Sequence, residues 1–239
     1  MMGLVHVILA VLSLLTVGQS APVTSCESLT KQVEIIGRNQ LLGKWMYIGE
    51  STTIAGFKLL TKALVETSWA RISAADESDA INVFQSQKML GRCFTATTKM
   101  TLGNNTLSMV HPMHVSEVLL STGCPDCLVL QTNFTFGGST YKGLQFMSRR
   151  ARVTDAEMDE FKKQVECLNL PPPTVLDPEK GFCPDESNLQ ETETTDLTTD
   201  ISSMNAEDVK LFDRFLSSSD GIQLLIKIIT TGLTGLKEN

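Results

Sequence analysis

The feature that most constrains this chain is a series of short segments between residues 41 and 150 in which apolar and polar side chains alternate. Alternation with a period of two is typical of a strand that buries one face. Residues that tolerate turn conformations separate these segments, at 75–79, 90–91, 103–105, 122–126 and 137–139. The pattern predicts eight strands, at 42–52, 65–74, 80–87, 91–102, 106–111, 115–121, 127–136 and 140–149.

The spacing of these strands favours an antiparallel sandwich or barrel over alternating strand–helix units. Eight antiparallel strands can close on themselves and leave room for one small ligand. The apolar content of 42% is enough to build a core in a chain of 239 residues. The predicted fold class is therefore all-β, with an eight-stranded antiparallel up-and-down barrel at its centre.

A single helix is predicted directly after the strands. Thr154 and Glu157 have the spacing of a capping box, in which each side chain satisfies a free backbone N–H of the first turn. Met158, Phe161, Val165 and Leu168 then recur at helical spacing, and the three prolines at 171–173 end the run. We expect this apolar stripe to pack on the barrel wall.

The N-terminal residues 1–20 have the pattern of a secretory signal peptide. An apolar run, Leu4 to Val17, is followed by the small residues around Gly18 and Ser20, which predicts cleavage before Ala21. The segment before the run lacks Lys and Arg, so a retained membrane anchor is the alternative, although the run is short for a membrane span. The predicted location is secreted and extracellular.

Charge, cysteine content and glycosylation motifs agree with secretion. The formal charge is −7, and an acidic protein repels phosphate backbones, which argues against a nucleic-acid partner. The six cysteines are even in number, as is usual in an oxidising compartment. Asn104 and Asn133 each begin an Asn-x-Thr sequon and are predicted to be glycosylated at the surface.

Two further regions follow the barrel and its helix. Residues 185–203 are rich in Glu, Thr, Ser and Asp, which predicts a linker too polar to fold alone. Residues 204–239 are predicted to form an amphipathic helical tail, with an interrupted apolar run that is short for a membrane span. The tail either packs on its own barrel or contacts a lipid surface or a partner. Its apolar positions at helical spacing are Val209, Phe212, Leu216, Ile222, Leu225, Ile226, Ile229 and Leu233.

Taken together, the Gly43-x-Trp45 motif that opens the first strand, the eight strands and the capped helix resemble the lipocalin family. The resemblance spans Cys26 to Pro184, so we interpret residues 21–184 as the lipocalin domain. In that family the tryptophan closes one end of the barrel, and a basic residue after the last strand packs over its ring. The resemblance thus implies that Trp45 forms the floor of a cup and that Arg149 or Arg150 covers it.

Two segments, LLGKWMYIGE and EMDEFKKQVECLNLPPP, more closely resemble the alpha-1-acid glycoprotein group and the fish saxitoxin-, tetrodotoxin- and tributyltin-binding plasma proteins. This resemblance implies the disulfides Cys26–Cys167 and Cys93–Cys183, which leaves Cys124 with Cys127. The Cys124-x-x-Cys127 spacing is also that of a redox motif. Redox motifs lie at a helix N-terminus, whereas strand residues follow here, which favours a structural bridge.

Strand alternation and the resemblance together predict the residues that face the cup. A glycan on Asn133 points outward, which places Thr132, Phe134 and Phe136 inside, and Trp45 inside places Tyr47 on the same face. Plain barrel filling is the alternative role for all of these side chains. By resemblance to the alpha-1-acid glycoprotein pocket, the remaining ligand-binding positions are Ile72, Val83, Met109, His111, Gln145 and Met147.

The predicted function is that of a carrier. The pocket residues suit a small hydrophobic or amphipathic ligand, held by a few oriented polar groups, and the resemblance extends to transport in plasma and sequestration of toxins or xenobiotics. The alternative is a lipoprotein-associated lipid carrier that acts through its tail, as in the apolipoprotein M branch.

Neither an enzyme nor a cofactor or metal site is predicted. His111 and His114 are an odd number of residues apart, which sends them to opposite faces of a strand unless a bulge intervenes. The sequence lacks a Gly-x-Ser-x-Gly nucleophile motif. A lipocalin-type isomerase is the enzymatic alternative, and it requires a free thiol in the cup.

Overall fold

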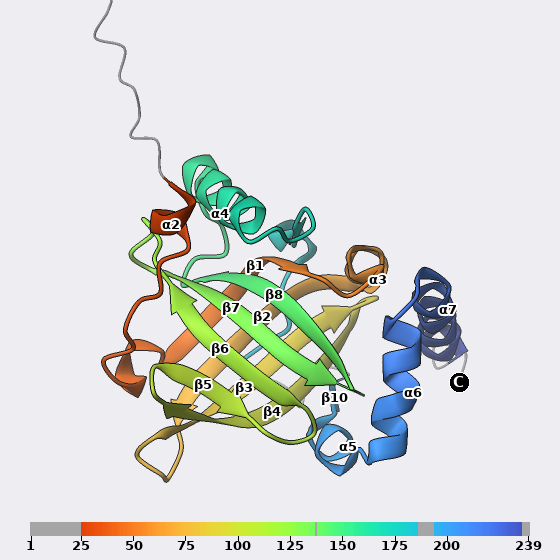
Figure 1. Ribbon diagram of the computed structural model, residues 1–239. Helices are drawn as coiled ribbons and strands as arrows, with labels where there is room; N and C mark the ends of the chain where they lie inside the picture. The colour runs from red at the N-terminus through yellow and green to blue at the C-terminus, as the bar shows by residue number, and fades with distance from the viewer. Residues whose placement is uncertain (1–24, 137, 186–193, 236–239) are drawn as a thin grey trace, which may run out of the picture.

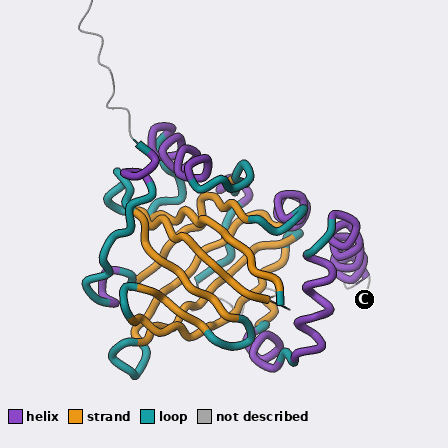
Figure 2. The backbone as a smooth tube through the Cα atoms, viewed as in Figure 1, coloured by secondary structure: helices purple, strands orange, loops and turns teal. Residues whose placement is uncertain are grey.

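A closed barrel of eight antiparallel strands forms the centre of the computed structural model, which describes residues 25–136, 138–185 and 194–235 (Figures 1 and 2). Each strand pairs with the next one along the chain, and β1 pairs with β8 to close the barrel. All eight lie within two residues of their predicted bounds, which confirms the predicted fold class. The strands are β1 Gly43–Thr52, β2 Val65–Ala74, β3 Ala80–Met89, β4 Arg92–Gly103, β5 Thr106–Met109, β6 His114–Leu120, β7 Cys127–Phe136 and β8 Ser139–Ser148.

The predicted helix is α4, Asp155–Cys167, and it packs on the outside of the barrel. Its capping box is complete, because Glu157 N–H donates to the Thr154 hydroxyl and Thr154 N–H donates to the Glu157 carboxylate. Phe161 is buried and stacks on Phe146 of β8, with 5.0 Å between ring centroids. The apolar stripe of α4 therefore covers the outer face of β7 and β8, as predicted.

A second helix, α3, Phe57–Leu64, lies between β1 and β2 and was not predicted. It begins after Gly56, whose φ of 73° is in the left-handed region that favours glycine. A helix of eight residues is marginal in isolation, so its stability depends on packing against the rest of the fold. Thr61 and Leu64 are the residues of this helix that are buried.

The N-terminal segment crosses one end of the barrel. It contains the short helices α2, Cys26–Leu29, and η1, Arg38–Gln40. The Arg38 guanidinium donates hydrogen bonds to the backbone carbonyls of Ala75, Glu77 and Ala80, which tie the segment to the β2–β3 connection. This end of the barrel is therefore closed by protein.

Residues 185–203 were predicted to be a linker too polar to fold alone, and the structure shows regular elements within it. Residues 186–193 lie outside the described part of the chain, but β10, Thr194–Asp196, and α5, Thr198–Ser203, lie within the stretch. β10 runs parallel to β4 at Cys93–Thr95. β5 pairs with β4 only at 101–103, so this part of the β4 edge offers backbone groups with which even a polar strand can pair. Two more short elements, β9 Thr174–Val175 and η2 Pro178–Lys180, precede this stretch.

The tail residues form two helices, α6, Ala206–Leu216, and α7, Ser219–Gly235, which lie together at the end of the barrel away from α2 (Figure 1). Ile222 of α7 is fully buried. The tail thus packs on its own barrel, one of the two predicted alternatives. The side chains of Phe212 and Leu233 lie outside the described set, and none of the described helices is long and apolar enough to cross a membrane.

Three disulfides brace the fold: Cys26–Cys167, Cys93–Cys183 and Cys124–Cys127. They confirm the pairing that the resemblance implied. Cys26–Cys167 joins α2 to the end of α4, and Cys93–Cys183 joins β4 to the segment that precedes residue 186. Cys124–Cys127 closes the β6–β7 connection, and β7 follows it directly, as expected for a structural bridge.

Candidate ligand cavity

Trp45 lies at the closed end of the barrel, 3% exposed. Its indole N–H donates to the Leu41 carbonyl at 2.7 Å, and the Arg149 guanidinium lies over the ring, 3.5 Å from the centroid. Arg149 also donates to the carbonyls of Leu42 and Lys44. The predicted covering residue is therefore Arg149.

The geometry at Arg149 explains the glycine of the Gly-x-Trp motif. Gly43 has a φ of 103°, and a Cβ built on it would lie 2.6 Å from Arg149 Nη1. Only glycine adopts this conformation without strain and leaves space for the guanidinium. The motif is therefore a requirement of the closed end of the barrel.

Arg150, the other candidate, points elsewhere. It forms ion pairs with Asp126, at 2.7 Å, and with Glu157, at 2.9 Å. Asp126 lies between the two cysteines of the β6–β7 bridge, and Glu157 lies in the first turn of α4. Arg150 thus joins the β6–β7 connection to the helix.

A cavity of about 440 Å³ occupies the barrel above this floor. Its lower wall is apolar and includes Leu41, Leu128 and Met100. Asn133 is exposed, in agreement with the parity that placed Thr132 and Phe134 inside. Eight of the eleven predicted ligand-binding residues line the cavity: Tyr47, Ile72, Val83, Met109, Thr132, Phe134, Gln145 and Met147.

The other three predicted residues are not part of the described cavity wall. Trp45 belongs to the core at the closed end and supports the wall residue Leu41 from below. His111 was expected inside but is exposed and bonds to the Ser202 carbonyl at 2.8 Å. β5 ends at Met109, so strand alternation does not extend to His111. The side chain of Phe136 lies outside the described set.

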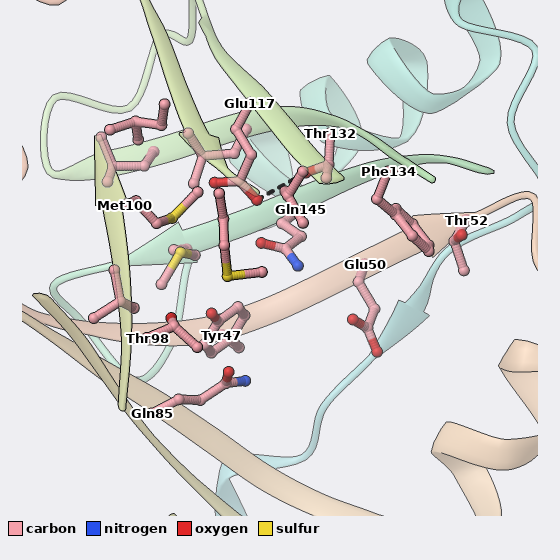
Figure 3. A pocket seen from close by; sticks show the side chains of 18 of the residues that line it. Tyr47, Glu50, Thr52, Gln85, Thr98, Met100, Glu117, Thr132, Phe134 and Gln145 are labelled. Carbon is pink, nitrogen blue, oxygen red and sulfur yellow. Dashed lines mark hydrogen bonds between the residues drawn. The ribbon is translucent and has the colours of Figure 1, made fainter. Parts of the chain in front are cut away.

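Two cavity residues, Glu50 and Glu117, were missed by the sequence analysis. Figure 3 shows the Glu117 carboxylate directed toward the cavity interior, beside Thr132 and near Gln145, and Glu50 nearer to Thr52 and Phe134. Glu117 accepts a hydrogen bond from the Thr132 hydroxyl at 3.1 Å, and Glu50 accepts one from the Thr61 hydroxyl at 3.2 Å. Each carboxylate thus has one neutral donor from the protein.

A β-bulge places Glu50 in the cavity. Tyr47 pairs with Met147 of β8, but Gly49 pairs with the next residue, Phe146, so one residue of β1, Ile48, is extra. Without the bulge, Tyr47 and Glu50 would face opposite sides of the strand. The register shift is not visible in the sequence, so simple alternation assigns Glu50 to the wrong face.

Glu117 was missed for a different reason. β6 is apolar on both faces, because Leu119 lies in the barrel core while Leu120 packs in the cluster beneath α4. Alternation therefore did not identify the inner face of this strand. Glu117 pairs with Thr132, whose inward direction was predicted, so the inward direction of Glu117 follows only once the strand register is known.

Burial changes the protonation of these groups. It raises the pKa of Glu117 and that of Glu50 to about 7, and the hydrogen bonds from Thr132 and Thr61 offset this only in part. The pKa of Tyr47 is also raised, first by burial and then by the two carboxylates. The phenol therefore remains a neutral hydrogen-bonding group at physiological pH.

No family model matches this chain, nor does any curated protein. Among solved structures, the siderocalin Ex-FABP, described as functioning through dual ligand specificities, matches with a TM-score of 0.51 and 20% identity. The match covers 57% of this chain and 93% of that chain. The fold is that of a lipocalin. At this identity the likeness shows the fold alone.

The cysteines of this chain bear on the enzymatic alternative. All six are in disulfides, so an isomerase mechanism has no free thiol to use. Within the described residues, the one cluster with metal-binding spacing is Cys124, Asp126 and Cys127. Both of its sulfurs are in the disulfide, and Asp126 pairs with Arg150.

Proposed function

We propose that this lipocalin is a secreted carrier that binds a small amphipathic molecule bearing a positive charge in its barrel. The observation that carries the proposal is the pair of cavity carboxylates, Glu50 and Glu117, with no Lys, Arg or His among the described residues of the cavity wall. The apolar body of the ligand occupies the lower cavity. Its cationic group lies beside the carboxylates.

The size and composition of the cavity support ligand binding. A volume of about 440 Å³ is in the range of small-molecule sites, which are mostly apolar with a few convergent polar groups. Burying apolar ligand surface contributes roughly 25 cal/mol per Å², while Gln145 and Tyr47 offer hydrogen bonds that fix orientation. The eight predicted residues on the cavity wall are proposed to contact the ligand.

The electrostatics support a cation in particular. Burial of a carboxylate without a charged partner costs free energy, which the raised pKa values of Glu50 and Glu117 reflect. A bound cation supplies the missing partner and restores the ionised form. An anionic ligand, in contrast, would meet two acidic groups.

Secretion and glycosylation are part of the proposal. Three disulfides suit an oxidising compartment, and Asn104 and Asn133 are both exposed, as an occupied sequon requires. The proposed signal peptide, residues 1–20, lies outside the described part of the chain. Sequestration of a toxin or xenobiotic is the use that the resemblance to toxin-binding plasma proteins suggests.

The test compares two fluorescent probes of similar size and different charge. Dansylcadaverine carries a primary ammonium group, and N-pentyl dansylamide is its neutral counterpart. We expect the mature chain, secreted from a eukaryotic host and stripped of ligand by organic extraction, to bind the cationic probe more tightly. Glu117→Gln should lower the affinity for the cationic probe about tenfold or more, in line with a lost charged contact. It should change the affinity for the neutral probe little.

Glu166→Gln is the matched control, because Glu166 is exposed on α4, outside the barrel. Equal affinities for the two probes in the wild-type chain would contradict the cationic class. Failure of both probes to bind, with no ligand mass released in native mass spectra on extraction, would reject the carrier function itself.

A lipoprotein-associated carrier is the second candidate. The observation that favours it is a set of apolar side chains on the tail, Leu211, Leu224 and Ile228, which are 48%, 50% and 53% exposed. Flotation of the full chain with phosphatidylcholine vesicles tests this candidate. A chain that stays in the soluble fraction argues for a free carrier.

A further inference from the structure

The α6–α7 unit, residues 206–235, lies at the open end of the barrel (Figure 1). The strands close the barrel all round, and Trp45 with Arg149 fills the opposite end. A ligand therefore reaches the cavity through the end where the α6–α7 unit is bound. The position of this unit decides whether that route is open.

A polar contact holds α6 to the barrel. Both carboxylate oxygens of Asp213 accept hydrogen bonds from the start of β8: Oδ1 from the Tyr141 hydroxyl at 2.9 Å and Oδ2 from the Ser139 hydroxyl at 3.1 Å. The ionised group makes these hydrogen bonds stronger than neutral ones. Asp213 does not line the cavity.

An apolar contact holds α7. Ile222 is fully buried in a cluster with Ile54, which lies between β1 and α3, and Tyr141 of β8. A Cβ built on Gly56, just before α3, would lie 3.2 Å from the Cβ of Ile222. The two helices also pack closely on each other, because Gly221 approaches the Phe215 backbone so closely that a Cβ would lie 2.5 Å from its carbonyl oxygen.

The same unit forms part of the cavity wall. Leu216, the last residue of α6, lines the cavity together with Phe57 of α3 and Met113 of the β5–β6 connection. Residues 204–239 contain no cysteine, so the unit is held to the barrel mouth by non-covalent contacts. Such a cover can detach without breaking a covalent bond.

We propose that the α6–α7 unit is a gating lid that closes over the ligand and must detach for the ligand to enter or leave. The proposal rests on the proposed function, in that the cavity is taken to be the ligand site. Weakening the Asp213 contact destabilises the closed state equally with and without ligand, because Asp213 does not touch the cavity. Both rate constants then rise together while the Kd stays constant.

The test measures the association and dissociation rates of dansylcadaverine by stopped-flow fluorescence on the full chain. We expect Asp213→Ala to raise both rates about tenfold, the size expected for lost charged hydrogen bonds, and to change the Kd less than about twofold. Glu207→Ala, an exposed acidic residue of the same helix, is the matched control. Unchanged rates in Asp213→Ala would overturn the lid.

A second variant locks the lid. A Cβ built on Gly56 would lie 3.2 Å from the Cβ of Ile222, just below the Cβ···Cβ distance of about 3.5–4.5 Å in disulfides. Gly56→Cys with Ile222→Cys should therefore cross-link the unit to the barrel, with backbone strain at position 56 because its φ of 73° favours glycine. The oxidised variant, its extra bridge verified by peptide mapping, should exchange the probe at least tenfold more slowly than wild type. Exchange at the wild-type rate would show that entry does not require detachment.

Hydrogen–deuterium exchange tests the lid proposal without any ligand. Residues 206–235 should be protected in the wild-type chain, and Asp213→Ala should raise exchange there while leaving β1–β8 unchanged. If the wild-type chain binds no probe, the proposed function fails. The exchange pattern then supports the lid proposal without relying on ligand binding. Equally rapid exchange of 206–235 in both chains would overturn the lid whatever the probe does.

Discussion

Glu117 and Glu50 give the ligand-free barrel a pH dependence that can be worked out at the residue scale. Their pKa values are about 7 in the folded protein, against 4.5 for an ordinary glutamate. Between these values the folded state binds more protons than the unfolded state, so the free energy of unfolding falls as pH rises. The loss is complete above about pH 7 and amounts to at most about 3 kcal/mol for each carboxyl.

Glu117→Gln replaces the carboxyl by a neutral group of the same shape. We expect it to be more stable than wild type at pH 7.5, by up to about 3 kcal/mol, and equal to wild type near pH 4.5. Urea unfolding of ligand-free protein at both pH values measures this, with Glu166→Gln as control. Carboxylates whose pKa is lowered, such as Asp126 and Glu157, do not affect this comparison, because their stabilising effect is lost only below about pH 4.5. A variant less stable than wild type at pH 7.5 would contradict the assignment.

Single residues also show where prediction from sequence stops. Alternation placed Thr132 and Phe134 correctly, because Asn133 anchored the outer face of their strand. The same argument fails at Glu50, beyond the extra residue Ile48, because a bulge depends on the partner strand. The cavity carboxylates that carry the proposed function therefore required the three-dimensional register.

At the scale of elements, local signals were sufficient for the strands and for α4. Alternation, turn residues and the Thr154 capping box are all local in sequence, and they found β1–β8 and the helix. α3 and β10 were not found because their stability comes from distant partners. β10 is polar and forms only because the Cys93–Thr95 edge of β4 is available.

The capping box of α4 gives the prediction at this scale. Thr154→Ala removes the acceptor of the Glu157 N–H and should lower the free energy of unfolding by about 1 kcal/mol. Thr154→Ser retains the hydroxyl and should stay within about 0.5 kcal/mol of wild type. Urea unfolding of the two variants provides the comparison. An equal loss in both would show that the methyl group of Thr154, and not the cap, is what matters.

At the scale of the whole molecule, the three disulfides restrict the unfolded chain to very different extents. Cys26–Cys167 and Cys93–Cys183 are separated by 141 and 90 residues, whereas Cys124–Cys127 spans only 3. In the chain-entropy model the two long bridges each stabilise the fold by about 5 kcal/mol and the short one by about 2 kcal/mol. The long bridges also join the N-terminal segment to α4 and the segment before residue 186 to β4.

Replacing each pair of cysteines by alanines should therefore give a fixed order of stability. Loss of Cys124–Cys127 should lower the free energy of unfolding least, by about 3 kcal/mol less than loss of either long bridge, because it closes the shortest loop. The Arg150 ion pairs also still hold the β6–β7 connection without this bridge. Urea unfolding of the three double variants under non-reducing conditions measures the order. A short-bridge variant that unfolds as readily as the others would mean that native-state packing around Cys124, rather than chain entropy, dominates its contribution.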